Sequence, residues 1–101
     1  ALIAEESMMD TAWASRAEDY IQANYSRNIT LEDMAGHTGF SIYYFSKLFK
    51  QQFQMNFVDY LTKVRIEKAK MMLHDEQASV KEVGRSVGYS EAGYFSRVFK
   101  K

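Results

Sequence analysis

The sequence predicts an all-α fold, and three observations support this prediction. There is no Pro among the 101 residues, so long helices can run without interruption. Apolar residues recur at helical spacing, which gives the expected helices an apolar face. The seven residues 44–50, YFSKLFK, return at residues 94–100 as YFSRVFK, with five of the seven positions identical. The chain is therefore expected to contain two copies of one small helical unit.

The first helix is expected to follow a short tail. Residues 1–9 are expected to be that tail, and Asp10 or Thr11 can cap a helix that runs to about Tyr25. Four residues fall on its apolar face, namely Trp13, Ala17, Tyr20 and Ile21. Residues 26–28 are expected to form a loop.

Each copy is then expected to open with a short, capped helix. Thr30 with Asp33, and Ser79 with Glu82, resemble capping boxes. In such a box the hydroxyl accepts a hydrogen bond from an unpaired N–H, and the acid lies at the positive end of the helix dipole. The short helices are expected at residues 31–37 and 80–87.

A Gly turn and a longer helix complete each copy. Gly39 and Gly88 can supply a left-handed turn, and Ser41 and Ser90 can cap the helices that follow. These longer helices are expected at residues 42–53 and 91–101. Phe45, Leu48 and Phe49 recur at the spacing of a buried face, so we expect them to pack in the core.

One long helix, at residues 56–74, is expected to link the copies. Its apolar stripe consists of Phe57, Leu61, Val64, Ala69 and Met72. About 18 residues at 1.5 Å each span ~27 Å. That length is near the ~34 Å of one DNA turn.

Composition excludes several classes of protein and site. The absence of Cys excludes disulfides, thiolate metal sites and cysteine nucleophiles. No apolar run approaches the roughly 20 residues of a membrane span, and no signal peptide is visible. His37 and His74 are isolated, so neither a zinc site nor another cofactor is expected. No strand-turn-helix elbow or Gly-rich loop frames a catalytic Ser, so no enzyme is expected.

Charge is unevenly distributed along the chain, although the formal net charge is zero. Residues 1–40 contain two basic and seven acidic residues, whereas residues 41–74 contain six basic and two acidic residues. Residues 75–101 contain five basic and four acidic residues. The positive charge thus begins where the longer helix of the first copy is expected to begin. Local potential rather than total charge attracts phosphates, so this distribution is compatible with nucleic acid.

A short helix, a tight turn and a second helix with basic and aromatic residues are typical of a helix-turn-helix. The second helix of such a unit, here called the reading helix, enters a DNA major groove. The residues that carry a closer resemblance lie in four stretches, at residues 17–35, 39–50, 57–69 and 83–101. The second contains GFSxxYFSKxFK and the fourth contains VGYSxxxYFSRVFKK.

Together these stretches resemble the DNA-binding domain of the AraC/XylS family of bacterial transcription regulators. The match covers nearly everything from Ala17 onward, and the second turn is one residue longer than the first, as in the family. Residues 60–70, YLTKVRIEKAK, resemble output domains of response regulators in two-component systems, where a receiver precedes this domain. Family members continue beyond the final Phe-Lys-Lys with another helix. We therefore expect the last family helix to be missing, and the chain, which starts at Ala1, to be a fragment.

The resemblance implies roles for the first reading helix. Base-edge contacts are expected at Tyr43, Ser46 and Lys47, because a Lys can donate to guanine O6 and N7 and a Tyr can contact a thymine methyl. Phosphate contacts are expected at Ser41, Ile42 and Lys50. The alternative is that this polar face is simply solvated.

In the second reading helix, Arg97 is the strongest candidate base reader, because its planar fork can bind guanine bidentately. Ala92, Gly93 and Ser96 complete the base-facing set. Ala and Gly have little hydrogen-bonding reach, so we expect this copy to contribute more positioning than base discrimination. Phosphate contacts are expected at Ser90, Lys100 and Lys101, of which the last two could also form a solvated helix end.

Three further side chains have two interpretations each. Tyr44 and Tyr94 could pack or face DNA, and packing is favoured. Arg65 matches a family position on the linker helix. It could pair with an acid inside the fold or contact DNA, and the internal pair is slightly favoured.

The sequence therefore predicts a module that binds double-stranded DNA sequence-specifically and places two reading helices in successive major grooves. It is expected to be cytoplasmic and to catalyse no reaction, in a full-length protein that dimerises through an upstream domain and could contact RNA polymerase. The alternative is a helical protein-interaction module that docks a partner such as RNA polymerase. The expected segments are a tail at 1–10, a first subdomain at 11–54, the linker helix at 55–75 and a second subdomain at 76–101.

Overall fold

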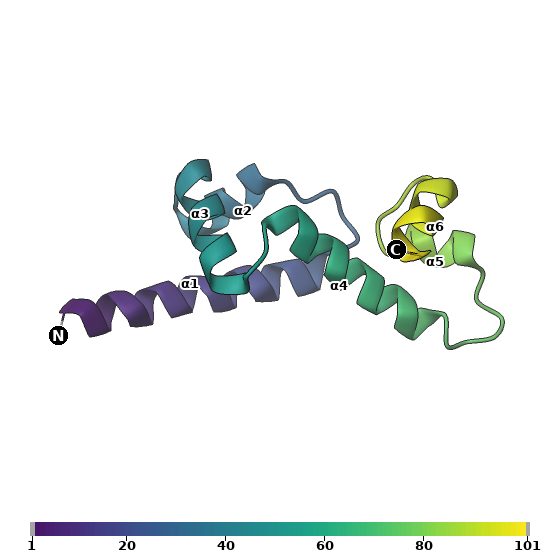
Figure 1. Cartoon of the computed structure of the whole chain (residues 1–101), viewed down its shortest axis with the longest axis horizontal. Coiled ribbons are helices and arrows are strands. Elements are labelled where there is room, and N and C mark those ends of the chain that lie inside the picture. The colour runs from purple at the N-terminus through teal and green to yellow at the C-terminus, as the bar shows by residue number, and fades with distance from the viewer. Residues whose placement is uncertain (1, 101) are drawn as a thin grey trace. The chain divides into compact units, whose positions relative to one another are not determined.

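The computed structural model describes residues 2–100 and is all-α, as predicted (Figure 1). The helices are α1 (Leu2–Asn24), α2 (Leu31–Thr38), α3 (Ile42–Phe53), α4 (Phe57–Met72), α5 (Val80–Ser86) and α6 (Ala92–Lys100). The chain divides into two compact units. The first unit contains α1, α2, α3 and the start of α4 up to Tyr60, and the second contains Tyr25–Asn28 and the chain from Leu61 onward. The expected linker helix is thus shared between the two units.

The first unit is built around Trp13 on α1, which is only 2% exposed. Its ring centroid lies 6.0 Å from that of Phe40, 5.7 Å from Phe45 and 6.3 Å from Phe53. All three contacts are edge-to-face, a geometry that aromatic pairs prefer. Because Phe45 and Phe53 belong to α3, this cluster holds α1 against α3. The short helix α2 contacts both of them (Figure 1).

The second unit has a separate hydrophobic core. Its buried members are Ala69, Val83, Val87, Tyr89 and Phe95. The α5 backbone lies against the Phe95 side chain of α6 at Gly84, where an added Cβ would lie 2.7 Å from Cδ2 of Phe95. Gly84 therefore makes room for the Phe95 ring, whereas the corresponding position of the first copy is the buried Ala35.

The predicted caps of α2 and α5 are present. The backbone N–H of Asp33 donates to Thr30 Oγ1 at 3.1 Å, and the Thr30 N–H donates to Asp33 Oδ2 at 2.9 Å, which completes the capping box. At α5, the Glu82 N–H donates to Ser79 Oγ at 3.0 Å. These bonds satisfy amides that a helix N-terminus otherwise leaves without a partner.

Both predicted Gly residues have positive φ, and Gly39 is the cap of its helix as predicted, whereas the cap of α5 is Val87. Gly39 has φ +79° and donates its N–H to the Ala35 carbonyl at 2.9 Å, which is a left-handed C-terminal cap. Gly88 has φ +111°, a conformation that side chains with a Cβ rarely adopt. Gly39 therefore ends α2, whereas α5 ends at Ser86 with Val87 as its cap, and Gly88 follows that cap. Each Gly redirects the chain toward the reading helix, which is α3 in the first unit and α6 in the second.

The expected start of the first helix was wrong. α1 begins at Leu2, so Asp10 and Thr11 lie inside the helix and do not cap it. The physical reason is that residues 2–12 contain no Gly or Pro and are rich in the helix formers Leu, Ala, Glu and Met.

The expected cap of the second reading helix was also wrong. Ser41 caps α3 as predicted, accepting from the Tyr44 N–H at 3.2 Å. In the second unit, however, α6 begins at Ala92, and the Phe95 N–H donates to the Glu91 carbonyl at 3.2 Å. Glu91 therefore occupies the N-cap position, and Ser90 lies one residue before it. The extra residue of the second turn shifts the cap by one position.

Candidate nucleic-acid interface

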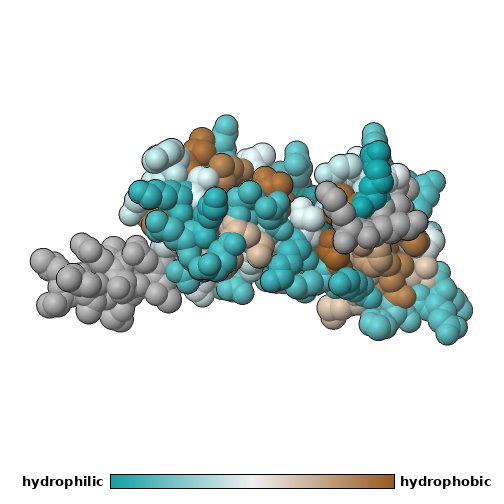
Figure 2. Space-filling view, viewed as in Figure 1, coloured by the Kyte–Doolittle hydropathy of each residue, from teal (hydrophilic) through white to brown (hydrophobic). Residues whose placement is uncertain are grey.

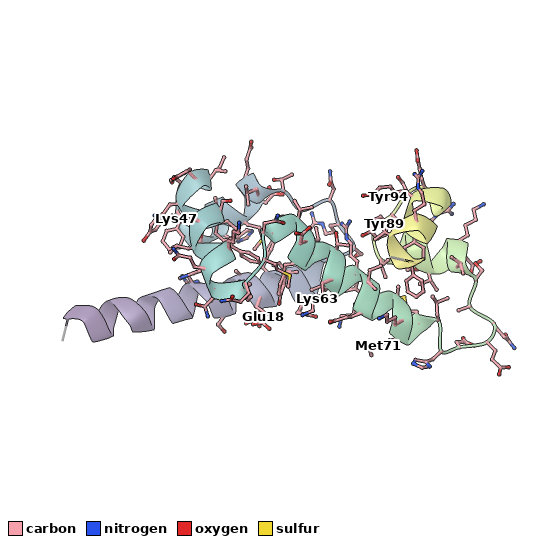
Figure 3. The ribbon with its side chains drawn as sticks, viewed as in Figure 1. Glu18, Lys47, Lys63, Met71, Tyr89 and Tyr94 are labelled. Atoms are coloured by element: carbon pink, nitrogen blue, oxygen red, sulfur yellow. The ribbon has the colours of Figure 1, made fainter. Side chains whose placement is uncertain are left out.

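The first reading helix, α3, has one face in the core and one at the surface. Phe45 and Phe49 are fully buried. On the opposite face Tyr43 is 79% exposed, and Lys47 and Lys50 are also exposed. Residues three and four apart are neighbours on a helix, so these three side chains form one continuous surface, part of which Figure 3 shows at Lys47. We call Tyr43, Lys47 and Lys50 the α3 surface.

The other predicted residues of the first copy lie around the α3 surface. Ser46 is only half-buried and lies one turn after Tyr43. Ser41 and Ile42 are exposed at the N-terminus of α3. The Ser41 hydroxyl accepts the Tyr44 N–H, and its own proton remains available to a phosphate oxygen. The structure thus brings all six predicted residues of the first copy to one end and one side of α3.

The second reading helix, α6, has the same layout among its described side chains. Phe95 is buried, whereas Gly93 and Arg97 are exposed four residues apart. The Arg97 guanidinium carbon lies 5.9 Å from the centre of the Tyr94 ring. Ser90 is exposed just before the helix. The side chains of Ala92, Ser96 and Lys100, and the whole of Lys101, lie outside the described residues.

Tyr44 and Tyr94 are not packed in the core, although the sequence favoured that interpretation. Their side chains are 46% and 50% exposed, so neither is a core residue. Each still has one aromatic neighbour, because Tyr44 lies 5.1 Å from Phe40 and Tyr94 lies 5.6 Å from Tyr89. Both rings therefore rest on the side of their unit with one edge in solvent.

Arg65 has an internal role, but its partners are not acids. Its Nε donates to the Tyr25 carbonyl at 2.7 Å, and its Nη2 donates to the Arg27 carbonyl at 2.9 Å. Its guanidinium carbon also lies 5.1 Å from the centre of the Tyr89 ring. A Cβ at Gly88 would lie 2.9 Å from the same guanidinium, so this Gly serves both the turn and the Arg. Arg65 thereby holds the second turn against α4.

The remaining candidates do not form a site for other chemistry. His37 lies against Tyr20, with ring centroids 4.0 Å apart, and borders an open hollow with Glu32, Asp33 and Gly36. Among the residues that the structure describes, no three metal-ligating side chains gather. Within the same part of the chain, no helix is long and apolar enough to span a membrane.

Comparisons with known proteins agree with this geometry. A family model described as a helix-turn-helix domain matches residues 34–101. The regulatory protein PocR of Salmonella typhimurium is 36% identical over 86 residues, covering 85% of this chain and 28% of that protein. The chain spans less than half the length of the first curated relatives that it matches.

Two solved structures are similar to this chain. The C-terminal domain of AraT, a response regulator from Geobacillus stearothermophilus, has a TM-score of 0.81 and 37% identity, covering 87% of this chain and 74% of that one. A probable AraC family transcriptional regulator from Rhodopseudomonas palustris has a TM-score of 0.77 and 28% identity, covering 88% and 84%. With its two helix-turn-helix units and these relatives, the chain belongs to the AraC/XylS family of transcription regulators and forms a DNA-binding domain of that family.

Proposed function

We propose that α3 and α6 are the two reading helices of this domain and enter successive major grooves of one double-stranded DNA site. The observation that carries the proposal is the α3 surface, where an exposed aromatic and two exposed cations lie opposite a fully buried Phe face. A helix of this kind offers hydrogen-bond donors and apolar contact to base edges, and positive charge to phosphates.

The proposed roles divide the α3 surface along the helix. Tyr43, Ser46 and Lys47 lie in the first half of α3 and would contact base edges, because the N-terminal residues of a reading helix reach deepest into the groove. Ser41 and Ile42 would hold a phosphate at the helix N-terminus, where amides and the dipole favour an anion. Lys50, one turn further on, would contact phosphate.

In the second unit, Arg97 would read bases, with Ala92, Gly93 and Ser96 facing the groove. Ser90, Lys100 and Lys101 would contact phosphates. Glu91 occupies the N-cap position of α6, so a carboxylate would stand where Ser41 stands in the first unit. A carboxylate near a phosphate is unfavourable, which supports a weaker role for the N-terminus of α6.

The full-length protein is proposed to be a response regulator of a two-component system, with a dimerising receiver domain upstream and a cytoplasmic location. The support is the similarity to the C-terminal domain of AraT, which is described as a response regulator. No catalysis is proposed for this chain, whose curated relatives include regulators of transcription.

A second candidate is a surface that docks a protein such as RNA polymerase. Exposed apolar side chains within each unit favour it, Val58 at 67% in the first and Met71 at 68% in the second, since protein interfaces need such side chains. In Figure 2, however, hydrophobic residues on the visible face form separate patches among hydrophilic ones. We therefore rank docking second to DNA binding, although one protein could do both.

The proposal is tested by fluorescence-anisotropy titration of the 101-residue chain against a random duplex pool at low and moderate salt, with sequencing of the bound fraction. Enrichment of two half-sites one helical turn apart, with affinity that falls steeply with salt, would support both reading helices. Enrichment of one half-site would restrict base reading to α3. Binding without enrichment, or no binding at low salt, would reject sequence-specific reading and favour the docking candidate.

A further inference from the structure

Two Arg guanidiniums flank a pair of Tyr rings in the second unit. The Arg65 guanidinium carbon lies 5.1 Å from the Tyr89 ring centre, and the Tyr89 and Tyr94 centroids are 5.6 Å apart. The Arg97 guanidinium carbon lies 5.9 Å from the Tyr94 ring centre. Figure 3 shows Tyr89 and Tyr94 together beside α6. We call these four residues the cation–ring ladder.

The inner half of the ladder is held firmly. Arg65 is fixed by its two hydrogen bonds to backbone carbonyls, and Tyr89 is 8% exposed within the core of the second unit. Tyr89 also lies 5.6 Å from the fully buried Phe95 ring. The Tyr94 ring therefore rests against a buried ring that is packed on both Arg65 and Phe95.

The outer half of the ladder reaches the proposed DNA face. Tyr94 and Arg97 are three residues apart on α6 and so lie on neighbouring turns of one side. A guanidinium within about 6 Å of a ring centre is attracted to the ring face. That attraction restricts an exposed, otherwise flexible side chain to fewer rotamers before it meets a base.

We propose that Tyr94 is a positioning residue that orients the Arg97 guanidinium for base reading by α6. This inference rests on the proposed function, since it assigns to Tyr94 a part in the same DNA contact. The expected contribution is small, because the pair is exposed. Loss of a cation–π contact at such a site corresponds to about a two- to five-fold change in affinity.

The first unit offers a matched control. Tyr44 occupies the same place in the repeat as Tyr94, but its ring meets Phe40 edge-on, at 88°. Lys47 stands where the second unit has Arg97, and a Lys is a compact point charge without a planar face. Replacing Tyr44 therefore removes a similarly exposed ring that has no guanidinium of the described residues over it.

The first measurement uses the free chain, without DNA. In the NMR spectrum, the Arg97 δ-methylene protons should be shifted upfield by the Tyr94 ring current. Tyr94→Phe should retain the shift because it keeps the ring, and Tyr94→Leu should abolish it. An Arg97 shift that is the same in the wild type and in Tyr94→Leu would overturn the proposal.

The second measurement is a double-mutant cycle that compares affinity for two duplexes. One is the duplex enriched from the random pool. The other differs from it at one base pair, chosen because the Arg97→Ala variant no longer distinguishes the two duplexes. Tyr94→Leu should lower discrimination two- to five-fold in the wild-type background and have no effect in the Arg97→Ala background. Tyr94→Phe should behave as wild type. Tyr44→Leu should show no such coupling to Lys47→Ala.

The other results of the cycle contradict the proposal. Additive losses from Tyr94→Leu and Arg97→Ala would show that Tyr94 acts independently of Arg97. An equal loss in Tyr94→Phe would show that the hydroxyl itself contacts DNA. If the wild type shows no discrimination between duplexes, both the proposed function and the positioning role fail. If the wild type discriminates and the coupling is absent, only the positioning role fails.

Discussion

The two helix-turn-helix units share a sequence pattern but use it differently at the start of the reading helix. When the repeats are aligned on Tyr44 and Tyr94, Tyr43 corresponds to Gly93 and Ser41 corresponds to Glu91. The buried positions hardly change, because Phe45 and Phe95 are both fully buried. The comparison teaches that the buried core defines the unit, whereas the residues that we propose to approach DNA differ between the two copies.

The units also anchor their turns by different means. The aromatic residue after the turn Gly is Phe40 in the first unit, where it meets the edge of Trp13. In the second unit it is Tyr89, which lies under the Arg65 guanidinium. An aromatic edge and a hydrogen-bonded cation thus perform the same task, which is to hold the turn against the preceding long helix.

The largest expected effect separates the two cores. Phe45→Ala and Phe95→Ala should each destabilise their own unit by about 3–5 kcal/mol, the usual result of emptying a buried Phe site. Trp13 is the single Trp of the chain and lies in the first unit, so its fluorescence reports that unit in a urea titration. Amide hydrogen exchange of α5 and α6 reports the second unit.

Phe45→Ala should shift the Trp13 transition to lower urea, and Phe95→Ala should leave that transition in place while lowering protection in α5 and α6. A shift of the Trp13 transition by Phe95→Ala of the same size as that by Phe45→Ala would show that the units unfold as one. The comparison between two independent cores would then be wrong.

The next effect tests whether Lys47 contacts bases and Lys50 contacts phosphate, as proposed for the α3 surface. Lys47→Ala should cost about 1–3 kcal/mol on the preferred duplex and relax the preference at one base pair. Lys50→Ala should weaken binding to all duplexes alike and reduce the salt slope by about one. Titrations against preferred and random duplexes at several salt concentrations distinguish the two. Equal proportional losses in both variants would remove the distinction between base reader and phosphate contact.

A third effect concerns the small residues at matching positions of α2 and α5, which are Ala35 and Gly84. Gly84→Ala should destabilise the second unit by about 1–2 kcal/mol, because overpacking of about 1–3 kcal/mol against Phe95 exceeds a helix-propensity gain of up to about 1 kcal/mol. The reciprocal Ala35→Gly should also destabilise the first unit, through lost packing and propensity. Thermal unfolding followed by circular dichroism measures both. A raised Tm in Gly84→Ala would mean that the Phe95 ring can move aside without cost.

Much of the fold followed from local signals that the sequence displays directly. The capping box at Thr30, the left-handed Gly39 and the Ser41 cap are interactions within four residues, so their spacing identifies them. The burial of Trp13, Ala17 and Ile21 follows from helical periodicity alone. The α3 surface could be predicted for the same reason, since it lies opposite a periodic Phe face.

The rest depended on features without a local signature. Arg65 bonds to carbonyls 40 and 38 residues away, and a carbonyl belongs to every residue, so the sequence offered acids as partners instead. The extra residue in the second turn was visible, but aligning on Gly88 favours Ser90 as the cap and aligning on Tyr94 favours Glu91. Only the backbone path decides between them. The start of α1 at Leu2 is indicated by helix propensity alone, which is a weak signal where no capping residue marks the boundary.

The smallest expected effect tests whether Gly93 allows the α6 backbone to approach DNA closely. A Cβ at Gly93 would meet no atom within 4 Å, and the residue is the second of α6, with no positive φ. Gly93→Ala should therefore stabilise the second unit by about 0.5–1 kcal/mol. Gly36→Ala in α2 is the matched control, because its added Cβ also meets open space. Both should raise the thermal midpoint slightly in calorimetry.

DNA binding then separates the two Gly residues. Gly36 lies on α2 and should be replaceable without any change in affinity for the selected duplex. If Gly93 lets the α6 backbone approach the bases closely, Gly93→Ala should weaken binding to that duplex despite its higher stability. Unchanged affinity would instead mean that the groove leaves room above α6. Gly93 would then be a position without a base contact. The first unit would contact a base at Tyr43, and the second unit would make no contact at the corresponding position, either by side chain or by backbone.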